Sequence, residues 1–415
     1  MNRILPQRIG GRFAAPPSKS EAQRLLLCAA LADAPTTILC PAVSQDILQM
    51  SAGLSALGAS IVRTAEGFAV TPLTAPPRTA AIDCGESGAV LRFLLPLAAA
   101  LGVETEFRRS ARLAERPIAP LAALLESHGC RLAELPDGRL LLRGRLRRGH
   151  IRFTIDGAVS SQFVSGLLMA LPLLGNEIGL TVLPPVVSAD YITLTTEVLL
   201  RFGVVWGATP DGFCLLADQR FHAPQQPLTA HGDWSGAAAL LCAGAISAPV
   251  TVTGLDLASR QPDREILTLL TRFGASVETR DGAVTVAPQR LHGIRATLEG
   301  YPDLLPPLAA VAAAAEGETR LFGVARLRWK ESDRPAVLAA MLRALGGEAA
   351  VQGDCLVIRG GRLLRGGTVS ACGDHRIAMA AALLACQCAA PLTLEGAQCV
   401  EKSYPQFWTQ LEESQ

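Results

Sequence analysis

The 415-residue sequence predicts a two-domain α/β protein in which a βαβαββ unit occurs six times. Two series of residues recur along the whole chain with the same spacing. Charged residues recur with this spacing too, at the starts of the predicted helices. A unit of this size cannot bury its hydrophobic face alone, and the terminal units lack the polar caps of an open solenoid. We therefore expect two closed groups of three units.

The first series is a threonine in a strand that follows an Ala/Leu-rich helix. Its members lie 68 to 76 residues apart and are Thr37, Thr105, Thr181, Thr251, Thr319 and Thr393. The second series is a glycine that ends an amphipathic helix before the next strand. Its members lie 71 to 74 residues apart and are Gly58, Gly129, Gly203, Gly274 and Gly346. Glycine favours this position because it tolerates a left-handed backbone. A sixth amphipathic helix is expected to begin at Pro405.

Composition excludes several classes of protein. A net charge of +1 and an aromatic content of 5% argue against a nucleic-acid-binding surface. The apolar stretches Leu91–Val103 and Phe163–Leu174 are shorter than the roughly 20 residues of a membrane-spanning helix, which predicts buried helices instead. Residues 1–11 lack the apolar run of a secretion signal. The eleven cysteines form no C-x-x-C pair, which favours free thiols in a cytoplasmic protein.

The sequence contains no motif for a cofactor or a metal. It has neither a P-loop nor the glycine spacing of a dinucleotide-binding turn, and its six histidines are dispersed. No G-x-S-x-G motif is present, so a hydrolase nucleophile is unsupported. We expect the glycines at 360–361 and 366–367 to form a hairpin turn.

Charged residues directly precede the predicted helices. Serine, aspartate and proline are ordinary helix-start residues, but cations there are unfavourable unless an anion binds as well. The cations in these positions are Lys19, Arg24, Arg116, Lys330, Arg334, Arg376 and Lys402. Helix N-termini bind phosphate and carboxylate, and arginine adds bidentate hydrogen bonds to both. The pattern indicates a site for phosphorylated, carboxylated small molecules.

Seven short motifs together resemble the 5-enolpyruvylshikimate-3-phosphate (EPSP) synthase family of enolpyruvyl transferases. In chain order they are PSKSEAQR (17–24), CGESGAVLR (84–92), ERPI (115–118), DGAVSSQF (156–163), KESDR (330–334), GDHRIAM (373–379) and EKSYP (401–405). The resemblance implies the enolpyruvyl transferase fold, with one domain formed by residues 1–18 and 231–415 and the other by 19–230. It also implies an active site in the cleft between the domains, no cofactor and a monomeric enzyme.

The resemblance further implies the reaction and its site. The enolpyruvyl group of phosphoenolpyruvate would pass to the 5-hydroxyl group of shikimate 3-phosphate by addition and elimination, as a step of aromatic amino-acid biosynthesis. Residues expected to bind shikimate 3-phosphate are Lys19, Ser20, Arg24, Ser160, Ser161, Gln162, Ser188, Tyr191, Asp303 and Lys330. Those expected to bind phosphoenolpyruvate are Lys19, Gly88, Arg116, Gln162, Arg334, Arg376 and Lys402.

Two carboxylates are candidates for proton transfer. Asp303 is the candidate base for the substrate hydroxyl, and Glu331, assisted by Lys19, is the candidate for proton exchange at C3 of phosphoenolpyruvate. Secondary candidates for the site are Glu86, His375 and Arg326. An aspartate or glutamate at a helix start is more often only a cap. The cations around Glu331 favour a role in catalysis for this residue. For Asp303, the catalytic role rests mainly on the resemblance.

The chain also departs from the family pattern. Glu86 and Ala89 stand where many members have asparagine and threonine, and Arg326 replaces a frequent asparagine. Two other functions stay open at this point. A UDP-N-acetylglucosamine enolpyruvyl transferase would carry a reactive cysteine near Arg116, and residues 108–115 contain none. A catalytically inactive, anion-binding paralogue would have lost Lys19, Asp303, Glu331 or Lys402, and all four are present.

Overall fold

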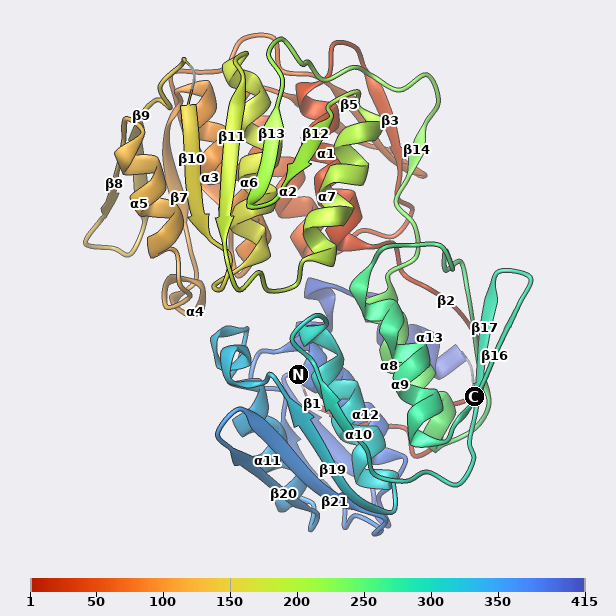
Figure 1. Ribbon diagram of the computed structural model, residues 1–415. Helices are drawn as coiled ribbons and strands as arrows, with labels where there is room; N and C mark the ends of the chain where they lie inside the picture. Colours follow the sequence, from red (N-terminus) through yellow and green to blue (C-terminus); the bar gives the residue numbers. More distant parts are fainter. Residues whose placement is uncertain (1, 150, 414–415) are drawn as a thin grey trace. The chain divides into compact units, whose positions relative to one another are not determined.

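The computed structural model describes residues 2–149 and 151–413 and contains two compact units (Figure 1). Unit 1 comprises Met1–Ser18 and His231–Gln415, and unit 2 comprises Lys19–Ala230. The chain therefore passes from one unit to the other twice.

Unit 2 contains three copies of the repeat. The first copy consists of α1 (Lys19–Leu31), β3 (Thr36–Leu39), α2 (Gln45–Ala56), β4 (Ser60–Arg63) and β5 (Gly67–Thr71), with β14 (Leu228–Thr229) as its first strand. The second consists of β6 (Thr79–Asp83), α3 (Gly88–Leu101), β7 (Glu104–Arg108), α4 (Ala111–Ala114), α5 (Ala119–Ser127), β8 (Cys130–Glu134) and β9 (Leu140–Gly144). The third consists of β10 (Ile151–Asp156), α6 (Ser161–Ala170), β11 (Ile178–Leu183), α7 (Asp190–Arg201), β12 (Trp206–Thr209) and β13 (Gly212–Leu215).

Unit 1 contains the other three copies. One consists of β2 (Gly11–Ala14), α8 (Trp234–Ile246), β15 (Val250–Thr253), α9 (Ile266–Phe273), β16 (Ser276–Arg280) and β17 (Ala283–Ala287). The next consists of β18 (Arg295–Thr297), α10 (Leu305–Ala314), β19 (Gly317–Phe322), α11 (Arg334–Ala344), β20 (Glu348–Gln352) and β21 (Cys355–Gly360). The last consists of β22 (Gly367–Ser370), α12 (His375–Ala385), β23 (Leu392–Glu395), α13 (Phe407–Glu413) and β1 (Asn2–Ile4).

The six copies share one sheet topology, which confirms the predicted repeat. In the third copy, for example, β10 and β11 are parallel, β11 and β13 are antiparallel, and β12 lies at the edge beside β13 (Figure 1). Within the described residues, five sheets have four strands in this order, and the sixth has three, β1-β23-β22. The chain ends supply first or last strands to sheets formed elsewhere, since β2 pairs with β15 and β1 pairs with β23.

Both residue series occupy equivalent places in every copy. The six threonines lie in the second strand of their copies, namely β3, β7, β11, β15, β19 and β23. The five glycines directly follow or lie just past the outer helices and have φ between 78° and 112°. These left-handed values explain the requirement for glycine at the helix ends. The sixth outer helix, α13, begins at Phe407 instead of Pro405, because Pro405 lies in the turn that precedes it.

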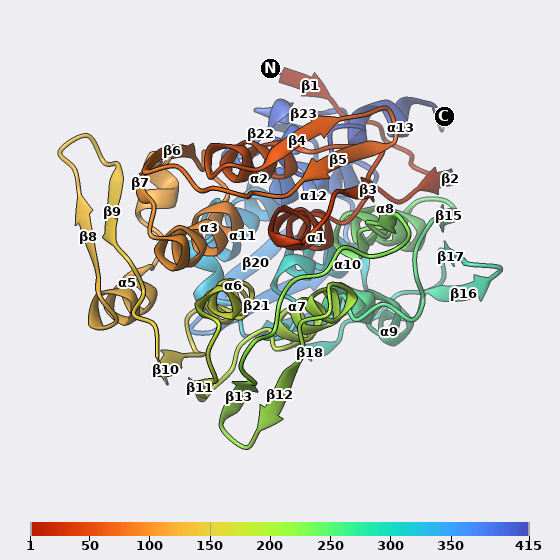
Figure 2. The ribbon, with the colours of Figure 1, turned by 90° about the horizontal axis from the view of Figure 1, so that it is seen from above.

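The apolar inner helices form the core of each unit. In unit 1, α8, α10 and α12 pack against one another, and in unit 2 α3 packs along α6. Figure 2 looks nearly along the axes of α1, α3 and α6. The two apolar stretches predicted to be buried lie in α3 and in α6 with its short 3-10 extension, where nearly every side chain is buried. No helix among the described residues is long and apolar enough to cross a membrane.

The prediction of a hairpin at the paired glycines is wrong. Gly360 ends β21 in one sheet, and Gly367 begins β22 in another, so the glycines belong to a connection between two copies of the repeat. A hairpin turn and a connection between two sheets can have the same glycine-rich composition. Only the sheet with which the following strand pairs distinguishes the two.

The repeat also sets where functional side chains can lie. In four copies the inner helix follows the first strand and leads into a parallel second strand, so the helix N-terminus lies at the carboxyl end of the first strand. The helices α1 and α8 instead follow the two passages of the chain between the units, because their first strands, β14 and β2, come from distant parts of the chain. This edge of an α/β layer is where ligands commonly bind.

Candidate active site

Six candidate residues of unit 1 lie in one network of charged side chains. They are Asp303, Lys330, Glu331, Arg334, Arg376 and Lys402, and Asp374 joins them. The residues come from the starts of α10, α11 and α12 and from the short helix at Ala397–Lys402. We call this set the unit-1 cluster.

Arg334 is the centre of the unit-1 cluster. Its Nη1 lies 2.6 Å from Asp303 Oδ1, its Nη2 lies 3.0 Å from Glu331 Oε2, and its Nε lies 2.8 Å from Asp374 Oδ2. Only 1% of its side chain is exposed. Burial opposes the charge, but the three carboxylates outweigh it and raise the pKa of Arg334 well above its usual value. Arg334 thus fixes the positions of both carboxylates predicted to transfer protons.

The two candidate carboxylates also contact other cations. Asp303 lies 3.4 Å from Lys330 Nζ and 3.6 Å from Arg376 Nη2. Glu331 lies 3.1 Å from Lys402 Nζ. Anionic ligands that enter this cluster would compete with the carboxylates for the same cations, because each cation has a limited number of donors.

Asp374 connects the cap of α12 to this cluster. Its Oδ1 accepts a hydrogen bond of 2.9 Å from the backbone N–H of Arg376, while its Oδ2 accepts from Ser332 Oγ at 3.0 Å as well as from Arg334. His375 follows it and is buried, with Nδ1 3.8 Å from Asp374 Oδ1. Asp374 is therefore both a helix cap and a buried counter-ion.

A further buried acid of unit 1 interacts electrostatically with Arg376. Asp263 is fully buried and accepts a short hydrogen bond from the Ser235 hydroxyl. Burial raises the pKa of Asp263 to about 7, the negative charge of Asp303 adds to this shift, and Arg376 opposes it. Arg376 itself donates to the backbone carbonyl of Ser235 at 2.5 Å.

The candidate residues of unit 2 have a different environment. Lys19, the first residue of α1, lies 2.9 Å from Asp46 Oδ2, and Asp46 lies in the first turn of α2. Only 16% of the Lys19 side chain and 6% of the Asp46 side chain are exposed.

Arg24, one turn further along α1, is surrounded by neutral oxygens. It donates to the carbonyl groups of Ser20 at 2.6 Å and Tyr191 at 3.2 Å, and to the hydroxyl groups of Thr195 at 2.7 Å and Ser165 at 3.3 Å. Burial lowers the pKa of Arg24 to about 10, so it keeps its charge at neutral pH. These bonds join α1 to α6 and α7.

Gly88 allows a close approach to Arg116. A Cβ atom at Gly88 would lie 2.9–3.0 Å from the Arg116 guanidinium group, which is too short for an ordinary contact. Nearby in sequence, Arg92 Nη1 donates to Gln162 Oε1 at 2.8 Å and its Nη2 donates to the Pro117 carbonyl at 3.0 Å. Arg92 thereby joins the Gly88 helix to the segments that carry the candidates Gln162 and Arg116.

The candidate serines lie at helix starts. Ser160 caps α6 and accepts a hydrogen bond of 3.3 Å from the Gln162 N–H, and Ser161 is the first residue of that helix. Ser188 is buried and has φ of 52°, a strained value for a serine. Its carbonyl group accepts from the N–H of Tyr191 at 3.1 Å, so its backbone opens α7.

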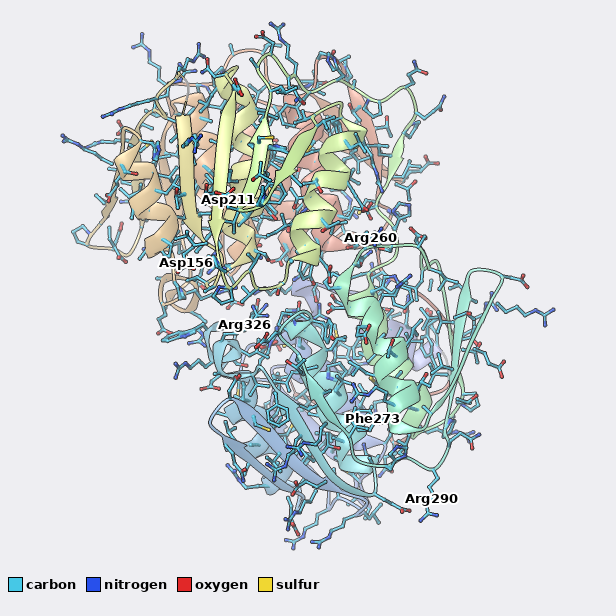
Figure 3. The ribbon with its side chains drawn as sticks, in the orientation of Figure 1. Asp156, Asp211, Arg260, Phe273, Arg290 and Arg326 are labelled. Atoms are coloured by element: carbon cyan, nitrogen blue, oxygen red, sulfur yellow. The ribbon has the colours of Figure 1, made fainter. Side chains whose placement is uncertain are left out.

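The secondary candidates Glu86 and Arg326 lie in different units. Glu86 is exposed on the loop before α3. Arg326 donates to the backbone carbonyl of Glu299, and its position in unit 1 is labelled in Figure 3.

The sequence patterns missed several residues that hold the candidates in place. They are Asp46, Arg92, Ser165, Thr195, Asp263 and Asp374. Asp46, Asp263 and Asp374 stand directly before or at predicted helices, so capping explained them sufficiently. Their positions in the repeat could have indicated a further role. Each of the three aspartates lies at the helix starts where the candidate cations also occur.

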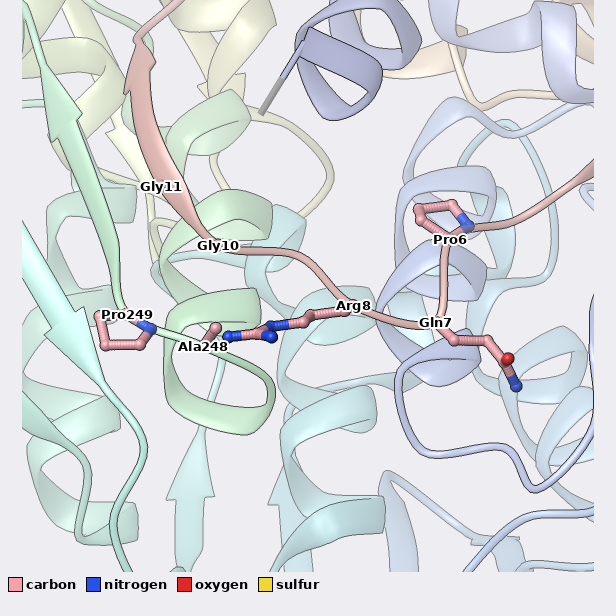
Figure 4. A pocket seen from close by; sticks show the side chains of 7 residues that line it. All are labelled: Pro6, Gln7, Arg8, Gly10, Gly11, Ala248 and Pro249. Carbon is pink, nitrogen blue, oxygen red and sulfur yellow. The ribbon is translucent and has the colours of Figure 1, made fainter. Parts of the chain in front are cut away.

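A separate cavity of about 700 Å³ lies in unit 1, between the segment from β1 to β2 and the turn before β15 (Figure 4). Its lining includes Arg8, whose side chain points toward Ala248 and Pro249, and it contains none of the candidate residues. Among residues 2–149 and 151–413, no group of three or more histidine, cysteine, aspartate or glutamate side chains could hold a metal ion.

Comparison with known proteins identifies relatives along nearly the full length. The family model described as EPSP synthase (3-phosphoshikimate 1-carboxyvinyltransferase) matches residues 5–411. The 3-phosphoshikimate 1-carboxyvinyltransferase of Clostridium kluyveri is 36% identical over 98% of this chain and 95% of its own length. The enzyme of the same name from Methanocorpusculum labreanum is 34% identical over 96% of this chain and 95% of its own.

Solved structures share the fold. The EPSP synthase from Acinetobacter baumannii superposes with a TM-score of 0.81 at 25% identity and covers 100% of this chain and 98% of that one. The enolpyruvyl transferase NikO from Streptomyces tendae superposes with a TM-score of 0.76 at 22% identity and covers 100% and 96%. These likenesses confirm the predicted enolpyruvyl transferase fold.

Proposed function

Because the chain belongs to the EPSP synthase family, we propose that it transfers the enolpyruvyl group of phosphoenolpyruvate to the 5-hydroxyl group of shikimate 3-phosphate. The observation that carries this proposal is the family match over residues 5–411. A UDP-N-acetylglucosamine enolpyruvyl transferase is not favoured, since the relatives named above are 3-phosphoshikimate 1-carboxyvinyltransferases. The products are 5-enolpyruvylshikimate 3-phosphate and inorganic phosphate, formed through a tetrahedral intermediate.

The two units contribute different residues to this reaction in our proposal. Shikimate 3-phosphate is bound by Ser20, Arg24, Ser160, Ser161, Gln162, Ser188 and Tyr191 of unit 2 and by Asp303 and Lys330 of unit 1. Phosphoenolpyruvate is bound by Lys19, Gly88, Arg116 and Gln162 of unit 2 and by Arg334, Arg376 and Lys402 of unit 1. The division of the chain into two compact units is compatible with two domains that serve one reaction.

Asp303 and Glu331 carry the proton transfers in this proposal. Asp303 removes the proton of the 5-hydroxyl group as its oxygen attacks C2 of phosphoenolpyruvate, and Glu331, assisted by Lys19, delivers a proton to C3. When phosphate leaves, Glu331 takes a proton back from that carbon. Support comes from the contacts of Glu331, which Arg334 and Lys402 hold from two directions. Incoming phosphate and carboxylate groups compete for these cations and release the carboxylates for proton transfer.

A phosphate-release assay with the full-length protein tests the function. Phosphate should form only when shikimate 3-phosphate and phosphoenolpyruvate are both present, and UDP-N-acetylglucosamine should not replace the acceptor. Absence of turnover with that pair, in protein shown to be folded by circular dichroism, would overturn the proposal.

The variant Glu331→Gln tests the proposed proton transfer. Its turnover should fall about 100-fold or more, because general acid–base catalysis contributes factors of this size. Its dissociation constants for the two substrates should change less than about threefold. Glu348→Gln is the matched control, since Glu348 is an exposed glutamate of the same unit, paired with Arg362 at the surface. An unchanged turnover in Glu331→Gln would remove Glu331 from the mechanism.

We also propose that the enzyme is a cytoplasmic monomer. All eleven cysteines are free thiols, which suits a reducing compartment. Size-exclusion chromatography with light scattering should give the mass of one chain, 43.6 kDa.

A further inference from the structure

Arg24 is a buried cation without a carboxylate partner in the part of the chain that the structure describes. Only 2% of the residue is exposed, and each of its four hydrogen-bond acceptors is a neutral oxygen. Its guanidinium carbon lies 5.0 Å from the centre of the Phe93 ring, which adds a cation–π contact from α3. Among the described residues Arg24 therefore makes no ion pair, and of the groups that raise its pKa Glu21 contributes the least.

Thr195 makes the shortest side-chain contact with this guanidinium group. It lies on α7, one turn after Tyr191, and is fully buried. Its Oγ1 accepts from Arg24 Nε at 2.7 Å and lies 2.8 Å from both the Tyr191 carbonyl oxygen and Ser165 Oγ. A hydroxyl group has one proton, so Thr195 donates to one of these oxygens, while its lone pair faces Arg24.

Ser165 completes the arrangement from a second helix. It is fully buried on α6, and its Oγ accepts from Arg24 Nη2 at 3.3 Å. The two hydroxyl groups thus contact one edge of the guanidinium group, and the carbonyl groups of Ser20 and Tyr191 contact the remainder. The Arg24 side chain would otherwise have several rotatable bonds, and these contacts from α1, α6 and α7 restrict them.

We infer that Thr195 is a positioning residue that orients Arg24 toward the anionic groups of shikimate 3-phosphate. The inference rests on the proposed function, in which Arg24 binds this substrate. A neutral acceptor satisfies the buried N–H group and leaves the positive charge for the ligand, whereas a carboxylate in the same place would compete with the ligand. The difference matters because misplacement of a binding group by about 1 Å can cost a factor of about 100.

The test is the variant Thr195→Val in the full-length enzyme. Valine keeps the branched shape of threonine and removes the hydroxyl group, so Arg24 Nε loses its acceptor. The KM for shikimate 3-phosphate should rise roughly 10- to 50-fold, whereas the KM for phosphoenolpyruvate should change less than about threefold. Calorimetric titration with shikimate 3-phosphate alone should show the same loss of affinity. Thr195→Ser, which restores the hydroxyl group, should recover most of it.

Thr196→Val is the matched control. Thr196 is the next residue of α7, and its hydroxyl group donates to the carbonyl group of Thr193 at 2.9 Å, one turn back in the same helix. The control should leave both KM values within about twofold of the wild type. Ser165→Ala gives a second measurement that does not depend on the folding of Thr195→Val, and its KM for shikimate 3-phosphate should rise about 3- to 10-fold.

The outcomes separate this inference from the proposed function. Equal changes in both KM values, an unchanged KM for shikimate 3-phosphate, or no recovery in Thr195→Ser would overturn the role of Thr195 while the wild type still turned over both substrates. A wild-type protein without turnover would instead overturn the proposed function. Recovery by serine together with the selective rise in one KM supports the inference.

Discussion

Arg334 in unit 1 and Arg24 in unit 2 are both almost fully buried, yet their charges are compensated in opposite ways. Arg334 is within hydrogen-bond distance of three carboxylates, which raise its pKa. Arg24 has four neutral acceptors, and burial lowers its pKa to about 10. The first environment resembles a complete ion-pair network, and the second resembles a cation prepared for an anion from outside the chain.

This difference suggests a division of work between the units. Carboxylates that transfer protons must be held near the reacting atoms, and in our proposal the unit-1 cluster holds Asp303 and Glu331 with cations that exchange partners when substrate anions arrive. A cation that only binds a substrate anion gains most when no internal carboxylate competes for it. Buried ion pairs stabilise weakly in net terms, but removal of one partner is costly. Variants of the Arg334 environment should therefore lose stability and turnover, whereas variants of the Arg24 environment should mainly lose affinity for shikimate 3-phosphate.

The largest effect is expected for Asp374→Asn. The substitution preserves the cap of α12, since asparagine is also a good cap, but it removes one of the three carboxylates around Arg334. The free energy of unfolding should decrease by roughly 3 kcal/mol, as for other broken buried ion pairs. Turnover should fall about 100-fold, because Arg334 positions Asp303 and Glu331.

Chemical denaturation and the phosphate-release assay measure these two effects. Glu348→Gln, which breaks the exposed pair with Arg362, should change the unfolding free energy by less than about 1 kcal/mol. If Asp374→Asn behaved like this surface control, the unit-1 cluster would not depend on its third carboxylate, and the contrast with Arg24 would lose its basis.

A smaller and more selective effect is expected for Arg24→Lys. Lysine keeps the charge but cannot make four hydrogen bonds in the same plane, so the KM for shikimate 3-phosphate should rise about 30- to 100-fold. The unfolding free energy should change less than in Asp374→Asn. The double variant Arg24→Lys/Thr195→Val should be little worse than Arg24→Lys alone, because Thr195 acts through Arg24. Additive losses in steady-state kinetics would contradict that coupling.

The fold was predictable because its signals are local and repeated six times. A glycine such as Gly58 or Gly274 ends a helix for a reason that its immediate neighbours supply, and its period then reveals the unit. The connection at 360–367 was misjudged because its composition specifies a turn and leaves open which sheet receives the next strand. Strand pairing at this point depends on β23, about 25 residues further along the chain.

For the candidate site, the sequence singled out the cations, and their binding roles stay predictions. Lysine and arginine at helix starts require an explanation, whereas aspartate there does not, so Asp374 and Asp46 were taken as caps. Asp374 is a cap, and it also pairs with Arg334, 40 residues earlier in the sequence. No local pattern reports such a pair. Thr195 is hidden for a related reason, since a threonine within a helix has no distinctive signature until Arg24 of another helix lies beside it.

The smallest effect concerns a buried carboxylic acid of unit 1 whose pKa rises. The fully buried Asp263 has a pKa of about 7 because burial and the charge of Asp303 oppose its ionisation, although Arg376 favours it and Asp233 opposes it further. The unfolded value is about 3.9, so the folded protein binds an additional proton between pH 4 and 7 and loses stability as the pH rises through this range. Asp263→Asn removes this dependence. The melting temperature of the variant relative to the wild type should therefore rise by about 2–4 °C between pH 5 and pH 8 in differential scanning calorimetry. The same difference in melting temperature at both pH values would show that Asp263 is ionised over this range, and Arg376 would then face one more negative charge beside the unit-1 cluster than its contrast with Arg24 assumes.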